Sequence, residues 1–592
     1  MKKRGIYILI LILVMLCLLN INSSAFITNN YFISNKNNQS LLSTFDYVII
    51  TDDSMQDKLS NFKSWKESLG FSVKVETISF ISDNYHGVDL AEQIRNCLIE
   101  NYLDWNIRYV LFVGSRNTIP MRICIPFSEF SDDQFLQCPS DYYYADLTGD
   151  WDSDNDGFFG EYQEDDMDFY PEVIVGRIPC DDSNEIENIL QRIINYESDN
   201  SDWKKNVLLA GAVIFYKNME ASGYTWERSD GATLMEECRL DIFEPNGYSC
   251  TRMYEEEGLR PSIYEYDIPL AKENVLIEWT KNYGIVDMLG HASNTKITRL
   301  VWTEDDGDNI PEYPGELDYT TFLSIGDSDD LTLEKPPIVY TSGCAQFFSS
   351  YNMGRKFIED GAAVAFIGTT QGSWYGESLK WDNENDGGTY SLNYYFFDNL
   401  MKNKQSCGNS LYSSKIFYYE NFWYNGLDKN WIFRSYDNMY SLTLYGDPSL
   451  GLYERSNIPD KPDQPDGPNS GKIRTEYTYK TSSIDTDGDQ VRYLFDWGDG
   501  ISTMSDYYSS GEEISVSHKW SEQGDFNIRV RCQDITGEFS DWSDPHPVSM
   551  PKYKLLFNYI QKELFNILKQ IIRDYMNIAS YCLQYLIVNS DY

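Results

Sequence analysis

The sequence predicts an α/β fold of doubly wound sheets in two side-by-side subdomains, followed by an all-β, immunoglobulin-like sandwich. Three observations predict it: strand-like apolar runs alternate with amphipathic helical patterns up to residue 368, a stretch rich in Pro, Gly and acid follows at 457–471, and apolar and polar residues then alternate in a two-residue period. Alternating strands and helices build parallel sheets covered on both faces, whereas the two-residue period is typical of half-buried strands.

Residues 45–200 are predicted to form the first α/β subdomain. Their strand-like segments are rich in Val, Ile and Phe, and their helical segments repeat apolar side chains at intervals of three and four residues. The predicted order is strand 45–53, helix 55–70, strand 71–78, helix 88–102, strand 108–114, strand 172–178 and helix 183–197. This order indicates a parallel sheet.

Residues 201–456 are predicted to form the second α/β subdomain by the same criteria. The predicted order is strand 205–212, helix 231–240, strand 284–290, strand 337–343, helix 352–361 and strand 362–368. In open sheets of this kind, ligands bind at the carboxyl ends of the strands. Residues that directly follow these strands are therefore the first candidates for a functional site.

The C-terminal part differs in composition. Residues 457–471 have the prolines, glycines and acids of a semi-rigid linker, and residues 472–550 alternate like strands of a β-sandwich with Gly-rich turns. The tail, 551–592, places apolar residues at helical spacing with lysines between them, which predicts an amphipathic helix. Packing on the sandwich and contact with a membrane surface or a partner are both open for this helix.

The first residues are typical of an export signal. Met-Lys-Lys-Arg precedes an apolar run at 5–19, and Ser-Ser-Ala at 23–25 is a suitable cleavage site. The run is short for a membrane span, although an uncleaved anchor is the alternative. We expect a signal peptide at 1–25, an N-terminal segment at 26–44, and a secreted or cell-surface protein.

Charge and cysteine content narrow the class of protein further. The 592 residues carry a formal charge of −44, which disfavours nucleic acid and favours bound cations or basic peptides, or a salt-adapted surface. Without Cys17, ten of the 11 cysteines remain, with no zinc-type spacing. Two pairs, Cys124 with Cys138 and Cys238 with Cys250, are close enough in sequence to form disulfides, but spacing alone does not assign them.

One cysteine and one histidine share the same local context. Cys344 follows the strand-like segment 337–343, and His291 follows the strand-like segment 284–290, each directly after a glycine. A nucleophilic cysteine needs a base within reach, and histidine has a suitable pKa near neutrality. Because parallel strands end at one edge of the sheet, the two side chains are expected to meet there. The alternative for each residue alone is a structural role in the core.

Residues 45–455 resemble the gingipain family of cysteine peptidases, which has a caspase-like fold. The resemblance rests on GIVDMLGHASN at 284–294, PIVYTSGCAQ at 337–346 and KFIEDGAAVAFIGTTQGSW at 356–374. It implies a secreted cysteine endopeptidase in which Cys344 attacks the scissile carbonyl and His291 protonates the leaving amine and then activates water. The oxyanion would face the N–H groups of Ala292 and Cys344, although the family more often has Gly after its histidine.

The same resemblance implies a substrate pocket. Asp230 matches an acidic pocket residue that pairs with a basic P1 side chain, and Trp374 matches an aromatic pocket wall. A helix N-cap is the alternative role of Asp230. Family enzymes often orient the histidine with a carboxylate at a position that falls here near apolar Val213, and Glu220 is the nearest acid downstream. The third catalytic residue is therefore left unassigned.

Alternate carboxylates predict a cation site. Such residues in one tight loop can wrap a hard cation. They are Asp150, Asp152, Asp154 and Asp156, followed by Gly157 and Glu161. Similar loops in the gingipain family hold calcium, so the resemblance implies that this loop binds Ca²⁺. The alternative is a loop that is only solvated. Residues 304–308 are a weaker second candidate, and 485–489 are expected to form a turn.

Residues 482–500 and 524–537 are similar to the polycystic-kidney-disease (PKD) domain family, whose members bind or space and rarely catalyse. The expected partners of the whole chain are protein or peptide substrates, with no nucleic acid. Two other functions are kept. A sortase-like transpeptidase would use Cys344 and His291 to pass the acyl group to an amine, and a non-catalytic surface adhesion or binding protein would need neither residue.

Overall fold

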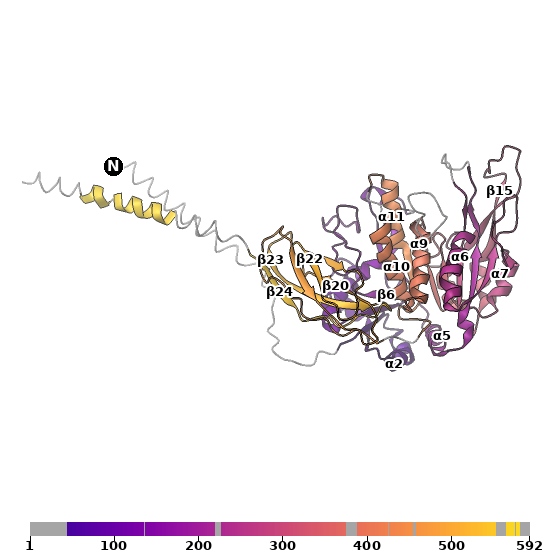
Figure 1. Cartoon of the computed structure of the whole chain (residues 1–592), viewed down its shortest axis with the longest axis horizontal. Coiled ribbons are helices and arrows are strands. Elements are labelled where there is room, and N and C mark those ends of the chain that lie inside the picture. Colours follow the sequence, from indigo (N-terminus) through magenta and orange to yellow (C-terminus); the bar gives the residue numbers. More distant parts are fainter. Residues whose placement is uncertain are drawn as a thin grey trace, which may run out of the picture. The chain divides into compact units, whose positions relative to one another are not determined.

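A computed structural model describes residues 44–134, 136–219, 227–374, 387–423, 426–453, 457–551, 564–574 and 576–580 (Figure 1). The expected signal peptide and, apart from Thr44, the expected N-terminal segment lie outside these ranges, as does Glu220. Within the described ranges, no helix is both long and apolar enough to cross a membrane.

A sheet of 11 strands forms the centre of the α/β part. Its strands are β1 (Tyr47–Thr51), β2 (Val73–Thr77), β3 (Tyr109–Val113), β6 (Ile174–Ile178), β7 (Asn206–Gly211), β10 (Ser249–Tyr254), β11 (Ile268–Pro269), β12 (Ile285–Leu289), β16 (Ile338–Thr341), β17 (Ala365–Thr369) and β18 (Leu442–Tyr445). They lie in the order β11-β10-β7-β12-β16-β17-β18-β6-β3-β1-β2. Every residue of β1, β3, β12 and β16 is buried, as expected for a sheet covered on both faces.

The two predicted sets of strands share this one sheet because β18 lies between them. It pairs antiparallel with β17 and parallel with β6, and all other neighbours in the sheet are parallel. The N–H of Gly446, just after β18, donates to the carbonyl of Arg177 on β6 at 2.8 Å. The last strand of the α/β part therefore joins its two halves.

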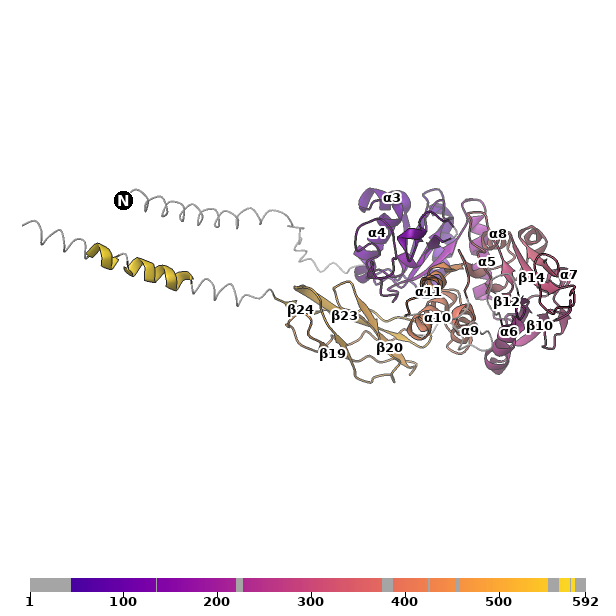
Figure 2. The same ribbon diagram turned by 90° about the horizontal axis from the view of Figure 1, so that it is seen from above.

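Helices connect and cover the strands. They are α2 (Ser60–Ser68), α3 (Ile78–Asn84), α4 (Leu90–Trp105), α5 (Ile186–Ser198), α6 (Ala232–Cys238), α7 (Lys272–Trp279), α8 (Met353–Asp360), α9 (Gly388–Met401), α10 (Cys407–Phe422) and α11 (Lys429–Ser441). Side-chain caps begin several of them, such as Asp89, which accepts from the N–H of Glu92 at 2.9 Å at the start of α4. Helices α9 and α10 lie side by side in Figures 1 and 2.

Short antiparallel strands extend the loops of the second half. They are β8 (Val213–Phe215), β9 (Ser229–Asp230), β13 (His291–Ala292), β14 (Lys296–Trp302) and β15 (Leu317–Ser324). Strand β8 pairs with β9, and β13, β14 and β15 form a three-stranded sheet. In the first half, β4 (Arg122–Cys124) pairs with β5 (Cys138–Ser140). Strand β8 begins two residues after the end of β7, and β13 begins two residues after the end of β12.

The C-terminal strands form the predicted β-sandwich. They are β19 (Tyr477–Thr481), β20 (Val491–Asp496), β21 (Ser502–Met504), β22 (Ile514–His518), β23 (Gly524–Asp534) and β24 (His546–Met550), in a four-stranded sheet β21-β20-β23-β24 and a pair β19-β22. Tyr479, Trp497 and Trp520 are fully buried in its core. The predicted fold class, α/β followed by an all-β sandwich, is confirmed. In the tail, residues 564–574 and 576–580 are helical and exposed.

Candidate active site

The candidate site begins where two neighbouring strands end. Strands β12 and β16 pair in parallel with Met288 opposite Thr341, and the N–H of Ser342 donates to the carbonyl of Met288 at 2.9 Å. His291 lies two residues beyond β12, and Cys344 lies three residues beyond β16. Both side chains therefore follow the carboxyl ends of adjacent strands, as the sequence predicts.

The two loops touch at Gly343. A Cβ atom on Gly343 would lie 2.7 Å from the Cβ of Ala292 and 2.8 Å from the carbonyl oxygen of Gly290. Both distances are too short for a side chain, so only glycine permits this approach. The residue before Cys344 is thus packed against the residues on either side of His291.

A backbone carbonyl orients the imidazole of His291. Its Nε2 lies 2.8 Å from the carbonyl oxygen of Ile214 on β8. A carbonyl only accepts hydrogen bonds, so Nε2 must carry the proton, and the neutral ring keeps its lone pair on Nδ1. The rings of Phe215 and Tyr319 flank the imidazole with centroid distances of 5.6 and 5.3 Å. This carbonyl serves where sequence reasoning looked for a carboxylate near Val213.

The protonation states of both residues follow from burial. Burial lowers the pKa of His291, against a smaller opposing effect of its hydrogen bond to Ile214. Burial also raises the pKa of the Cys344 thiol, against a hydrogen bond with the Ser373 backbone. Near neutral pH the site therefore holds a thiol and a neutral imidazole, so the thiol needs a base to become a nucleophile.

The segment 371–374 runs beside the sulfur of Cys344. The N–H of Ser373 donates to Sγ at 3.4 Å, and Sγ lies 3.7 Å from the carbonyl oxygen of the same residue. Ala345 adopts a positive φ of 60° and its N–H donates to the carbonyl of Gln371 at 2.7 Å. Among the described residues, the N–H of Cys344 finds no acceptor, so it is free to face an oxyanion.

Helix α11 holds this segment from the other side. Asn438 accepts from the N–H of Trp374 at 2.9 Å and donates to its carbonyl at 3.0 Å. The indole N–H of Trp374 donates to Oδ2 of Asp437 at 2.5 Å. Asp437 is fully buried, and burial raises its pKa to about 7. Sequence reasoning missed both residues because an Asp-Asn pair inside a helix carries no local signal.

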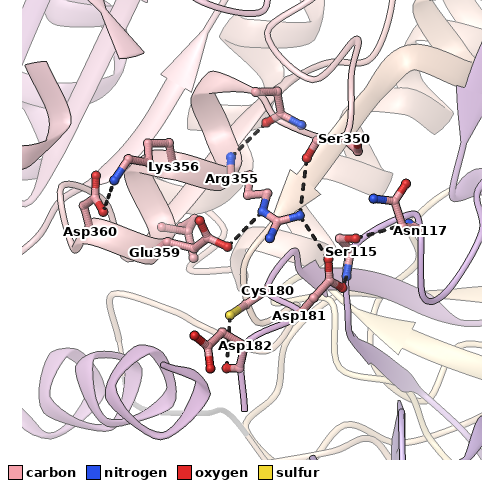
Figure 3. Close-up of polar contacts among 12 residues, drawn as sticks. Ser115, Asn117, Cys180, Asp181, Asp182, Ser350, Arg355, Lys356, Glu359 and Asp360 are labelled. Atoms are coloured by element: carbon pink, nitrogen blue, oxygen red, sulfur yellow. Dashed lines mark hydrogen bonds and ion pairs between the residues drawn. The ribbon is translucent and has the colours of Figure 1, made fainter. Parts of the chain in front are cut away.

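Arg355 anchors the loop that follows Cys344 (Figure 3). Its guanidinium donates to the carbonyl of Ser350 at 3.4 Å, to Glu359 on the same helix α8 at 2.8 Å, and to Asp181 at 3.0 Å. Asp181 follows β6 and also accepts from the N–H of Ser115 at 2.8 Å. The loop that follows Cys344 is thereby tied to strand ends of the first half.

The predicted pocket residues already have partners within the chain. Asp230 is buried on β9, opposite Val213 on β8. Its Oδ1 accepts from the N–H of Ala232 at 3.2 Å, and its Oδ2 accepts from Arg228 at 3.1 Å. Asp230 is not the helix N-cap considered from sequence, because α6 begins at Ala232 and its N-cap is Gly231. The guanidinium carbon of Arg434 lies 5.0 Å from the ring centre of Trp374.

The acidic loop forms two overlapping groups of carboxylates. Oxygens of Asp152, Asp154 and Asp156 lie within 4.8 Å of one another, as do those of Asp154, Glu161 and Glu164. Glu161 is 1 % exposed, and its Oε2 accepts no hydrogen bond among the described residues. Burial raises the pKa of Glu161, so a cation beside its orphaned oxygen would offset an unfavourable charge. The residues present fit a hard cation with oxygen ligands.

Other predicted acidic residues lie as follows. Asp150 forms a β-bridge with Asp166 and belongs to neither group, whereas Glu164, which sequence reasoning did not choose, belongs to one. Asp165 accepts from the N–H groups of Gly160 and Glu161 at 2.8 Å and closes the loop. In the second candidate, 304–308, Asp305, Asp306 and Asp308 also gather within 4.8 Å.

His86, His518 and the other described cysteines have surroundings that differ from those of His291 and Cys344. His86 is exposed, and His518 pairs with Asp499 at 2.7 Å while stacking on Trp497 in the sandwich. Every described cysteine is a free thiol, although Cys124 and Cys138 lie directly opposite each other across β4 and β5. Cys344 is one of two described cysteines that are not fully buried.

A thiol and a neutral imidazole that follow adjacent parallel strands at the carboxyl edge of an α/β sheet are the arrangement of a cysteine peptidase. Peptidase family C25 matches residues 40–453, and a PKD domain matches residues 468–544. The chain therefore belongs to Peptidase family C25, the gingipain family of cysteine peptidases, and carries a PKD domain after its catalytic part.

Solved structures similar to this chain include an Arg-specific cysteine proteinase, gingipain R, with 16 % identity over 87 % of this chain and 99 % of the other, at a TM-score of 0.47. The RgpB pro- and mature domains of Porphyromonas gingivalis match at 15 % identity over 85 % of this chain and 100 % of the other, at 0.47. A PKD domain of an M14-like peptidase from a Thermoplasmatales archaeon matches at 35 % identity over 17 % of this chain and all of the other, at 0.16. No curated protein matches the chain.

Proposed function

We propose that this peptidase is an exported endopeptidase that hydrolyses peptide bonds through Cys344 and His291. The observation that carries the proposal is the contact between the two strand-end loops, with Nε2 of His291 fixed on the carbonyl of Ile214. The imidazole Nδ1 takes the thiol proton as sulfur attacks the scissile carbonyl, and the same proton then passes to the leaving amine. In the second half of the cycle, Nδ1 removes a proton from the water that cleaves the thioester.

The proposed oxyanion hole is formed by the N–H groups of Cys344 and Ala292. Preorganised backbone donors stabilise the negative oxygen that develops during acyl transfer. The close contact of Gly343 with Ala292 brings the two segments that carry these donors together. We propose that the segment 371–374, which borders the sulfur, is where the substrate chain lies.

The proposed substrate preference is a basic P1 side chain, bound by Asp230 with Trp374 as a pocket wall. Support comes from the burial of Asp230, because a buried carboxylate binds a cation in preference to a neutral group. A set of fluorogenic peptides that differ only at P1 tests this preference. Arg or Lys should give the highest kcat/KM, whereas equal cleavage after Arg, Asn and Asp would refute the pocket and leave the Cys344–His291 mechanism standing.

Hydrolysis and transpeptidation share the same acyl-enzyme. Family membership favours a peptidase over a non-catalytic adhesion protein. Mass spectrometry of products formed with and without added glycine peptides separates the two reactions. Free carboxylates as the main products support hydrolysis, and ligated products would support transfer.

We also propose that the acidic loop binds Ca²⁺ as a structural ion, with Asp152, Asp154, Asp156 and Glu161 as ligands. Support comes from the shared position of Asp154 in both carboxylate groups and from the orphaned oxygen of Glu161. Calcium added to chelated, metal-free protein should raise the melting temperature, because the ion binds only the folded state. Glu161→Gln should remove this rise, and Glu513→Gln, which breaks an exposed ion pair with Lys480, should not. No rise at millimolar calcium would exclude the site.

We propose that the C-terminal tail of this secreted enzyme contacts a membrane surface or a cell-surface partner. The described tail helix exposes Leu564, Ile571 and Met576, which suits contact with a membrane surface or a cell-surface partner. Flotation of the full chain with anionic vesicles tests the first of these. Binding that a deletion of residues 551–592 abolishes supports surface contact, whereas equal flotation of both forms would exclude a role for the tail.

A further inference from the structure

Asp230 is held by an arginine of its own chain. Nη2 of Arg228 lies 3.1 Å from Oδ2 of Asp230, and the ion pair is partly shielded, with side-chain exposures of 25 % for the arginine and 5 % for the aspartate. Arg228 also donates to the carbonyl of Pro261 at 2.6 Å and to the carbonyl of Arg260 at 3.3 Å. Three acceptors thus fix the guanidinium beside the carboxylate.

This ion pair lies next to the base of the reaction. Asp230 is paired with Val213, and the next residue of the same strand, Ile214, accepts the hydrogen bond from His291. Gly231 packs so closely on Leu289 that an added Cβ would lie 2.7 Å from the Leu289 side chain, two residues before His291. A charge at Asp230 is therefore well placed to act on a substrate side chain in the site.

The ion pair changes what the carboxylate can offer to a substrate. A guanidinium binds a carboxylate best through two parallel hydrogen bonds, one to each oxygen. Here Oδ1 already accepts from the N–H of Ala232, and Oδ2 already accepts from Arg228. A basic P1 side chain would thus meet a neutral pair with both oxygens engaged, together with the positive charge of Arg228.

We propose that Arg228 is a specificity-determining residue that competes with a basic P1 side chain for Asp230. This inference rests on the proposed pocket function of Asp230. A P1 guanidinium takes the place of Arg228 on Oδ2, while Arg228 stays hydrogen-bonded to the carbonyls of Arg260 and Pro261 and is not left unpaired. Arg228 thereby weakens the selection of basic over neutral side chains that Asp230 alone would impose.

The test compares P1 arginine with P1 citrulline, its neutral isostere, in otherwise identical peptides. Arg228→Gln removes the competing charge and keeps a hydrogen-bond donor for the carbonyls. It should raise the Arg-to-citrulline ratio of kcat/KM on the order of tenfold, mainly through a lower KM for the arginine peptide. Arg228→Lys keeps the charge and should leave the ratio within about twofold of the wild type. The matched control is Arg252→Gln on β10, which breaks the 2.8 Å ion pair of Arg252 with Asp267 and should not change the ratio.

Asp230→Asn separates failure of this inference from failure of the pocket. If Asp230→Asn lowers the Arg-to-citrulline ratio but Arg228→Gln leaves it unchanged, Arg228 does not compete and the inference is overturned alone. If neither variant changes the ratio, Asp230 is not a pocket residue and both proposals fall. An equal loss of kcat/KM for both peptides in Arg228→Gln, with a lowered melting temperature, would assign Arg228 a structural role and would also overturn the inference.

Discussion

Asp437 offers a quantitative test of how the site is built. Its pKa of about 7, against an ordinary value of 3.8, arises mainly from burial, opposed by Trp374, Cys138 and Gly372. Between these two pH values the folded protein keeps the proton and the unfolded chain releases it. The free energy of unfolding should therefore fall as pH rises, by up to about 1.4 kcal/mol per pH unit and by roughly 4 kcal/mol in all.

Asp437→Asn removes this dependence and keeps an acceptor for the indole N–H of Trp374. Urea unfolding at pH 5 and pH 8 should show the mutant losing less stability than the wild type over this interval. The matched control is Asp318→Asn at an exposed position on β15, which should behave like the wild type.

The same substitution should also change the nucleophile. A negative charge on Asp437 raises the pKa of Cys344, so its removal should lower that pKa and speed iodoacetamide labelling of Cys344 near pH 7.5, measured by peptide mass spectrometry. Identical pH dependence of stability in mutant and wild type, with unchanged labelling, would refute the assigned environment of Asp437.

Two further substitutions test the loops around the nucleophile. Arg355→Met should lower kcat by about tenfold or more because the loop after Cys344 loses its anchor on Asp181, and steady-state kinetics with far-UV circular dichroism would check this; full activity would show that the ion pair does not position the loop. Gly343→Ala should remove most activity, because the added methyl would lie 2.7 Å from the Cβ of Ala292, whereas Gly326→Ala, where a Cβ meets nothing closer than 4.0 Å, should not. Wild-type turnover in Gly343→Ala would contradict the close approach of the two loops.

An apolar strand followed by a glycine precedes both Cys344 and His291, and this shared pattern was sufficient to predict the elements around the two residues. Both strands are continuous apolar runs that the sheet buries on both faces, and the following residues lie at its carboxyl edge. By contrast, β18 is a short strand after a long helical region, and nothing local shows that it pairs between β17 and β6. The single continuous sheet therefore depends on a long-range contact that periodicity does not reveal.

The site residues that sequence reasoning missed act through backbone or long-range contacts. The carbonyl of Ile214 orients His291, and a carbonyl is present at every position, so no residue type marks it. Arg228 and Asp230 are close in sequence, but their spacing does not show that they form an ion pair. It also does not show that Arg228 donates to the carbonyls of Arg260 and Pro261. Asp437 reaches Trp374 across 63 residues of chain.

In the proposed mechanism, Cys344 and His291 act together as nucleophile and base. Its most direct test is the turnover of a fluorogenic peptide by Cys344→Ala and His291→Ala, each compared with the wild type and with Cys250→Ala and His86→Ala as matched controls. Each site variant should lose at least about 1,000-fold in kcat while keeping the wild-type melting temperature, and both controls should remain active. Near wild-type turnover in a folded Cys344→Ala or His291→Ala protein would contradict the mechanism.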